Sequence, residues 1–290
     1  MSSKILVIGA VNIDFNIHSD QPYVLHDSNI VHHQKQVGGV GANIAQNLAN
    51  FGMDVSFLTM FSIDALGIFA KQTLTHKGIL IDHCDTMSLP SNMYMAIFDQ
   101  QRDLYLGLND MPLVDEMTPR WIKTKYQYIT SFDAIVLDNN LPQKTIEYLV
   151  KTYSSKRIYI DAVSGVKAPK LVNIINQVYV IKMNHAEFEI LFPKETVPPK
   201  TMLLVSNGSQ KITLYQGDNI VHQTPETIEH PISTSGAGDA LFSGFIYGLE
   251  SQYSLPTSLS IGAYAAYKTI HVKSSINHEV NINEFLHRIK

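Results

Sequence analysis

Lys4-Ile5-Leu6-Val7-Ile8-Gly9 is a continuous apolar run near the start of the chain, and it ends at a glycine. A run without polar alternation is typical of a strand that is buried on both faces of a parallel sheet. Helical patterns separate it from later runs, for example at residues 42–51, 67–77 and 145–152. This alternation predicts an α/β protein with a doubly wound, mostly parallel sheet. The later apolar runs, each followed by a polar or glycine-containing turn, lie at residues 55–58, 134–137, 157–160, 178–181 and 202–205.

Two segments interrupt this alternation. Residues 15–36 and 91–109 show period-two patterns with turn residues between them and no helical stretch. They would form either two surface hairpins or one small sheet above the carboxyl ends of the main strands, where α/β sheets bind ligands. The pattern alone favours the hairpins.

The composition argues against several kinds of partner. The 290 residues carry a formal net charge of −4 with scattered Lys and Arg, so we expect no nucleic acid. No apolar run approaches the ~18 residues of a membrane helix, so we expect no membrane partner either. The single Cys84 cannot form an internal disulfide, and the first residues lack the apolar segment of a signal peptide. We therefore expect a cytoplasmic protein.

The most informative motif is Ser233-Thr234-Ser235-Gly236-Ala237-Gly238-Asp239, which is followed by an amphipathic helical pattern. A glycine-rich turn that opens a helix leaves the backbone N–H groups of Gly236, Ala237 and Gly238 free to bind an anion. A carboxylate directly after such a site would repel a resting phosphate. Asp239 is therefore either a catalytic base or a capping side chain on an ordinary tight turn.

Two further motifs carry polar side chains at strand or helix ends. Gly38-Gly39-Val40-Gly41-Ala42-Asn43 opens a helix, and Asn43 offers a two-sided amide. Asn12 and Asp14 follow the first strand, where an amide and a carboxylate suit the neighbouring hydroxyls of a sugar. The turn after that strand lacks Gly-x-Gly-x-x-Gly, which disfavours a Rossmann dehydrogenase, and no Walker A motif indicates a P-loop enzyme.

Taken in order, these motifs resemble the ribokinase-like carbohydrate kinases over essentially the whole chain. The resemblance implies one kinase domain over residues 1–290, with residues 15–36 and 91–109 forming a β lid rather than separate hairpins. It also implies that Asn12, Asp14, Gly39 and Asn43 bind sugar hydroxyls. Asp239 would accept the proton of the hydroxyl that attacks the γ-phosphate of ATP. An ordinary Asp pKa near 4 would make that proton transfer late.

The resemblance also implies a nucleotide site. Asn184 and Glu187 would organise water and Mg²⁺ beside the phosphates, although three-residue spacing also fits a solvated helix face. Nucleotide contacts would come from Ser235 and from the turn Ser206-Asn207-Gly208, while Lys211 replaces a glycine of the family pattern. Ser233 stands where the family often has an aspartate that helps to hold K⁺, so we expect weak K⁺ activation or none.

Within the family, the chain most resembles the pseudouridine kinases, chiefly through Asp161-Ala162-Val163-Ser164-Gly165-Val166-Lys167-Ala168. This predicts phosphorylation of the 5′-hydroxyl of pseudouridine. A strand end with a solvated Lys167 fits the same residues equally well. Ribokinase, another nucleoside kinase and a fructokinase-type enzyme remain alternatives, whereas a non-catalytic sugar- or nucleoside-binding regulator is disfavoured by Asp239. The β segments also suggest a homodimer through the lid. The candidates for reading base and ribose are Asn92, Tyr94, Asn140, Ser164 and Lys167.

Overall fold

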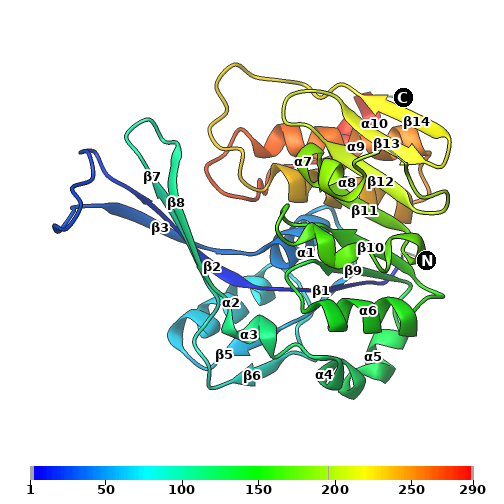
Figure 1. Ribbon diagram of the computed structural model, residues 1–290, viewed down its shortest axis with the longest axis horizontal. Helices are drawn as coiled ribbons and strands as arrows, with labels where there is room; N and C mark the ends of the chain where they lie inside the picture. The colour runs from blue at the N-terminus through cyan, green and yellow to red at the C-terminus, as the bar shows by residue number, and fades with distance from the viewer. Residues whose placement is uncertain (1–2, 195, 289–290) are drawn as a thin grey trace.

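The computed structural model describes residues 3–194 and 196–288, and its centre is an eight-stranded sheet (Figure 1). The strand order is β14-β13-β12-β11-β10-β9-β1-β4. From β12 to β4 all neighbours are parallel, whereas β13 and β14 form an antiparallel edge. The predicted α/β class and mostly parallel sheet are confirmed. The strands are β1 (Ile5–Ile8), β4 (Val55–Leu58), β9 (Ala134–Asp138), β10 (Arg157–Asp161), β11 (Val180–Asn184), β12 (Met202–Ser206), β13 (Ile212–Gln216) and β14 (Asn219–Gln223).

Helices cover both faces of this sheet, because its strands are apolar on both faces. Ile5 and Val7 of β1 pack into one core and Leu6 and Ile8 into the other, as the two-residue period of a strand requires. The first core is closed by α1 (Val40–Asn50), α2 (Ala65–His76), α8 (Ala237–Glu250) and α9 (Leu255–Thr269). The second core is closed by α3 (Pro112–Asp115), α4 (Pro119–Thr124), α5 (Tyr126–Thr130), α6 (Gln143–Thr152) and α7 (His185–Leu191), while α10 (Ile282–Arg288) packs on α9.

The far end of α8 is tied to the start of β10. The Glu250 carboxylate accepts hydrogen bonds from Arg157 Nε (2.8 Å) and Nη2 (2.7 Å) and from the hydroxyl of Tyr159. Glu250 is buried, so the paired guanidinium offsets the cost of removing its charge from water. This contact fixes the helix whose first turn carries Asp239.

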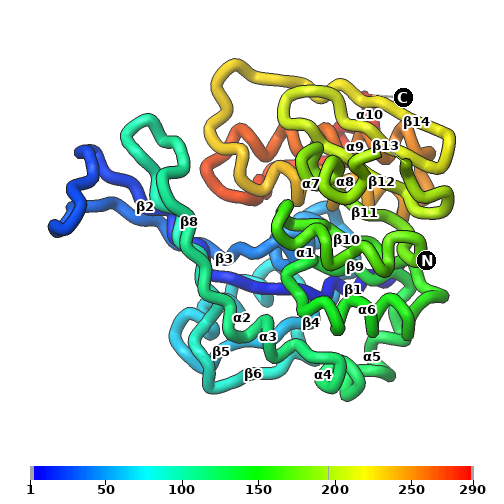
Figure 2. Tube along the Cα trace, viewed as in Figure 1, coloured from blue at the N-terminus to red at the C-terminus, as the bar shows by residue number. Residues whose placement is uncertain are grey.

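The two segments that interrupt the alternation form one four-stranded sheet, here called the small sheet, rather than two hairpins. It projects from the body of the molecule (Figure 2). Its central pair joins residues about 80 positions apart in parallel register, for example Ile13 and Met93. The strands, in spatial order, are β3 (His32–Gly38), β2 (Asn12–His18), β7 (Met93–Phe98) and β8 (Leu104–Asp110).

The small sheet grows out of the carboxyl-end edge of the main sheet, since β2 follows β1 after a short turn (Figure 1). A second, two-stranded parallel sheet is formed by β5 (Met60–Ser62) and β6 (Asp85–Met87). Within the described residues, no helix is long and apolar enough to span a membrane.

Candidate active site

The glycine-rich turn sits where α8 begins, at the carboxyl edge of the main sheet. Gly236 has a left-handed backbone with φ of 76°, and a Cβ on it would lie 1.9 Å from the carbonyl oxygen of Ser275. Glycine is therefore required there on both grounds. Ala237 and Gly238 form the first helical positions, so their N–H groups have no acceptor within α8. The Ala237 N–H donates to the Thr234 carbonyl of the preceding loop at 3.3 Å.

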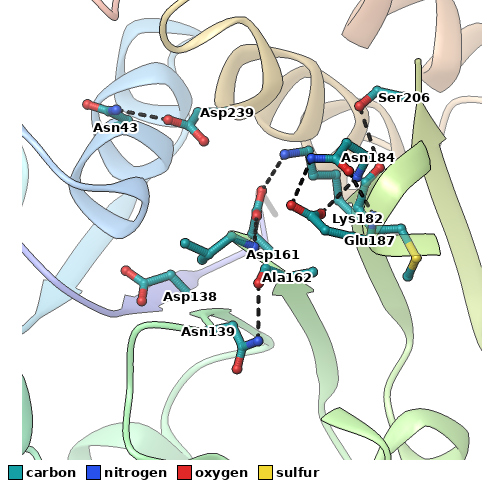
Figure 3. A network of polar contacts seen from close by, with 12 residues as sticks. Asn43, Asp138, Asn139, Asp161, Ala162, Lys182, Asn184, Glu187, Ser206 and Asp239 are labelled. Carbon is teal, nitrogen blue, oxygen red and sulfur yellow. Dashed lines mark hydrogen bonds and ion pairs between the residues drawn. The ribbon is translucent and has the colours of Figure 1, made fainter. Parts of the chain in front are cut away.

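Asp239 is buried in the first turn of α8, and its Oδ2 accepts a hydrogen bond of 2.8 Å from Asn43 Nδ2 (Figure 3). The N-cap residue of α8 is Gly236, which has no side chain, and the hydrogen bond of the Asp239 carboxylate comes from the Asn43 amide rather than from a backbone N–H of the first turn. Burial raises the pKa of Asp239 to about 7, with a contribution from the charge of Asp161, while Lys182 and Asn43 act in the opposite direction. This differs from the expected pKa near 4 and makes Asp239 a stronger base at neutral pH.

A buried ion pair lies beside this carboxylate. Lys182 Nζ is 3.0 Å from Asp161 Oδ2, and the two residues are direct neighbours on the parallel strands β11 and β10 (Figure 3). Burial alone would lower the pKa of Lys182, but the carboxylates of Asp161 and Asp239 raise it above its ordinary value. The ammonium is only 2.8 Å from the position of a Cβ on Gly238, so it lies next to the turn. No role for this pair was expected from the sequence.

Three side chains on the other side of Asp239 have buried oxygens without a hydrogen-bond partner. They are Asn12 Oδ1, Asp14 Oδ1 and Asn43 Oδ1. A buried unpaired oxygen costs about 1–3 kcal/mol, so a group of them indicates a place for ligand donors. Burial also raises the pKa of Asp14 to about 7. Gly39, with φ of 92°, holds the turn that brings these groups together.

Asp138, at the end of β9, holds the two loops that carry these side chains. Its carboxylate accepts hydrogen bonds from the backbone N–H groups of Ala10 (2.8 Å), Gly41 (2.9 Å) and Asn140 (2.8 Å). A Cβ on Gly9 or Gly41 would lie 2.4 or 2.7 Å from its Oδ2, so both glycines allow this approach. Burial raises the pKa of Asp138, while these N–H donors lower it. This role of Asp138 was also missed in the sequence.

Two of the residues predicted to read the base touch each other. Lys167 Nζ donates to Asn140 Oδ1, and burial lowers the pKa of Lys167, so this lysine is not simply solvated. Ser164 is half-buried in the same loop. The loop contains Val163 at φ of 70°, an unfavourable conformation for a β-branched residue and one found mostly at functional sites.

Of the other two predicted residues, Tyr94 lies in β7 of the small sheet and Asn92 lies directly before β7. Tyr94 lies directly beside Asp14 across β7 and β2, on the same face. The Asn92 amide is engaged by the backbone, since Nδ2 donates to the Val11 carbonyl (3.1 Å) and Oδ1 accepts from Leu113 N–H (3.0 Å). Asn92 therefore braces the base of the small sheet.

Asn184 and Glu187 form a capping box at the start of α7 instead of a solvated helix face. Asn184 Oδ1 accepts from the Glu187 N–H (2.9 Å), and Glu187 Oε2 accepts from the Asn184 N–H (2.8 Å). Asn184 Nδ2 donates to the second carboxylate oxygen, Oε1, at 2.9 Å. Both oxygens of Glu187 are therefore engaged (Figure 3). Glu187 is buried, while Asn184 is exposed. The described residues contain no cluster of three or more His, Cys, Asp or Glu arranged to hold a metal ion.

A cavity of about 300 Å³ lies on the other side of the turn. Ser206, the last residue of β12, and Gly208, in the turn that follows, line it together with Ala237 and Gly238. Asn207 is half-buried and donates to Gln210 Oε1 within its own turn. The remaining wall is mostly apolar and includes Ile212, Leu241, Tyr267 and Ile270.

Ser235, the remaining residue predicted to contact the nucleotide, lies in the loop before Gly236. Its hydroxyl is 3.4 Å from the hydroxyl of Ser275. Ser233, which stands where the family often has an aspartate, accepts a hydrogen bond of 3.2 Å at its Oγ from the Ser235 N–H. This bond stabilises the loop. Of the predicted residues, Asn43 is bonded to Asp239, and Ser206 and Gly208 line the cavity beside the turn.

A model of the pfkB family carbohydrate kinases matches residues 2–281. The pseudouridine kinase of Escherichia coli K12 is 26% identical over 257 residues, which cover 83% of this chain and 82% of that protein. The guanosine-inosine kinase of Exiguobacterium acetylicum is 23% identical over 286 residues, 92% of this chain and 94% of that protein. The Arabidopsis thaliana ribokinase complexed with ribose and ATP superposes with a TM-score of 0.84 at 17% identity, covering 100% of this chain and 99% of that chain.

Proposed function

Because the chain belongs to the pfkB family of carbohydrate kinases, which are ATP-dependent sugar or nucleoside kinases, we propose that it phosphorylates the 5′-hydroxyl of pseudouridine. The observation that carries this proposal is the position of Asp239. It is a buried carboxylate with a pKa of about 7, between unpaired buried oxygens on one side and an anion-binding turn beside a cavity on the other. A phosphoryl transfer needs a base, a place for the acceptor and a place for the phosphates close together.

The acceptor occupies the side of Asp239 that faces the small sheet. The ribose hydroxyls donate to Asp14, Asn12 and Asn43, whose free oxygens each lack a partner in the described structure. Gly39 allows the backbone to approach the sugar closely. The small sheet acts as a lid, because Asp14 and Tyr94 lie in one row on it and closing it would exclude water from the reacting atoms.

In the chemical step, the 5′-oxygen forms a bond to the γ-phosphorus while the bond from that phosphorus to the β-bridging oxygen of ATP breaks. ADP leaves, and Asp239 takes the proton of the hydroxyl. The transfer is still late, because a pKa of about 7 remains far below that of an alcohol. Charge on the transferring group is stabilised by the N–H groups of Gly236, Ala237 and Gly238.

ATP occupies the cavity, with its base against the apolar wall and its phosphates at the turn. Ser206, Gly208 and Ser235 contact it, and Asn207 shapes the turn. Mg²⁺ would neutralise charge on the phosphates, and Asn184 and Glu187 would be the residues that hold it, through water. The residues fit an indirect role only, because both oxygens of Glu187 are engaged and the exposed Asn184 faces solvent beside the turn.

Specificity for pseudouridine rests on the loop after β10 and its neighbours. Pseudouridine has a base N–H at the position that is the glycosidic nitrogen in uridine, and a buried acceptor left without that donor costs about 1–3 kcal/mol. Ser164 and Asn140 offer acceptors, Lys167 donates to Asn140, and Tyr94 lies beside Asp14 on the small sheet. Asn92 fixes the base of the small sheet through its hydrogen bond to the Val11 carbonyl.

The test is a panel of acceptors with ATP: pseudouridine, uridine, adenosine, inosine, ribose and fructose. We expect the highest kcat/KM for pseudouridine, with uridine lower by about 5- to 150-fold if one acceptor is left unpaired. A higher kcat/KM for any other member would replace pseudouridine as the acceptor. No phosphoryl transfer to any member, with ligand binding retained, would favour a non-catalytic binding protein.

The outer strand of the small sheet suggests a homodimer. In β8, Leu104, Tyr105, Leu106 and Leu108 are between 45% and 56% exposed, which is unusual for four apolar side chains in one strand. β8 is also an edge strand, and its backbone can pair with a second copy. We therefore propose that two copies of the chain pair through β8 of their small sheets.

A further inference from the structure

A segment near the end of the chain, residues 273–277 and here called the strap, lies directly against the glycine-rich turn. Ser275 is 2% exposed, and its carbonyl oxygen fills the place that a Cβ on Gly236 would take. The strap is anchored in α9, because Asn277 Nδ2 donates to the Lys268 carbonyl at 2.7 Å. A shift of the strap would therefore move the residue that opens α8.

The strap is also bonded to the small sheet. Gln36 Nε2, from β3, donates to Ser275 Oγ at 2.8 Å. That hydroxyl lies 3.4 Å from Ser235 Oγ, in the loop before Gly236. A continuous chain of side chains thus runs from β3 through the strap to the turn.

The β3 end of this chain lies beside the acceptor side of the site. Gln36 is directly opposite Asp14 in the antiparallel β2–β3 pair, so the two side chains share one face of the small sheet. The Asp14 carboxylate extends over Gly38, two residues further along β3, where a Cβ would be 1.8 Å from its Oδ2. The strands that hold the acceptor carboxylate therefore also hold the strap.

We propose that Gln36 is a positioning residue that couples the acceptor site to the phosphate-binding turn through Ser275 and Ser235. This inference rests on the proposed function. An acceptor bound to Asp14 fixes the β2–β3 pair, and the Gln36 amide then holds the strap against Gly236 so that the turn keeps its anion-binding shape. Linkage requires that nucleotide and acceptor strengthen each other's binding by the same factor.

The experiment measures this factor by calorimetry on the full chain. The Kd of Mg²⁺ with a non-hydrolysable ATP analogue is determined without acceptor and with saturating pseudouridine, and the ratio is the coupling factor. We expect Gln36→Ala to lower the ratio by about two- to tenfold, the range for one lost hydrogen bond. The Kd of each ligand alone should stay within about twofold of wild type.

Two further variants sharpen the result. Ser275→Ala removes the same bond from the strap side and should lower the ratio equally, and the double variant should lower it no further. Gln34→Ala is the matched control, because Gln34 has the same side chain on the same face of β3 but is exposed. It should keep the wild-type ratio.

The proposal is overturned by a wild-type ratio of 1, by a wild-type ratio in Gln36→Ala, or by an equal loss in Gln34→Ala. If Gln36→Ala does not fold, Ser275→Ala decides the same question. If the acceptor panel selects another compound, the proposed acceptor fails. The coupling factor is then measured with that compound and decides the role of Gln36 separately.

Discussion

The buried carboxylates predict that kcat/KM and kcat respond differently to acid. Asp14 and Asp239 both have a pKa of about 7. In the free enzyme both must be ionised, Asp14 to receive the acceptor and Asp239 to take the proton. In the ternary complex, acceptor hydroxyls donate to Asp14 and keep it ionised, so Asp239 alone titrates. Between pH 8 and pH 6, kcat/KM should fall by about 100-fold and kcat by about tenfold.

The assay follows ADP release at constant ionic strength with pseudouridine, or with the best acceptor of the panel. Asp14→Asn should reduce the fall in kcat/KM to about tenfold, because one titrating group is lost. Asp218→Asn is the control, since Asp218 is exposed in the turn between β13 and β14. Equal acid dependence of kcat and kcat/KM in the wild type would refute the reasoning, and so would an unchanged profile in Asp14→Asn.

Four other outcomes follow from the structure. Lys182→Met should lower the free energy of unfolding by about 3–5 kcal/mol in urea titrations, because Asp161 stays buried without its partner, and adding Asp161→Asn should restore much of it. Asp14 binds its proton more tightly when folded than unfolded, so the stability it contributes is lost as pH rises toward 7. Asp14→Asn should therefore raise unfolding free energy at pH 8 by about 2–3 kcal/mol, unless the acceptor is present. Replacing Na⁺ with K⁺ should raise the rate only weakly or not at all, because Ser233 lacks a carboxylate, and a large saturable activation would contradict this. Leu106→Lys should shift sedimentation from dimer to monomer, whereas a wild-type monomer would remove the dimer proposal.

The sequence predicted the main sheet well because its strands are buried on both faces and so read as unbroken apolar runs. The small sheet was ambiguous for a physical reason. Its central pairing joins β2 to β7, and a parallel pairing between distant segments leaves no local pattern. Two hairpins and one sheet have the same alternation, and only the resemblance to a family favoured the sheet.

Within the candidate site, the glycine-rich turns and Asp239 could be singled out because each belongs to a short motif of neighbouring residues in the sequence. The roles of Asp138 and of the Asp161–Lys182 pair could not, since they depend on which strands are neighbours. A usable signal was present: each of these residues is a charged side chain at or near the carboxyl end of an apolar strand. The pKa of Asp239 could not be predicted at all, because it is set by burial and by charges that the fold brings together.

The central claim is that Asp239 is the base in a phosphoryl transfer, and one measurement tests it most directly. Turnover at saturating ATP and acceptor is compared between wild type, Asp239→Asn and Asp239→Ala, with acceptor Kd measured by calorimetry. Both variants should lower kcat by about 10²–10⁴ while the acceptor Kd changes little. Turnover close to wild type in a folded Asp239→Ala protein would contradict the account.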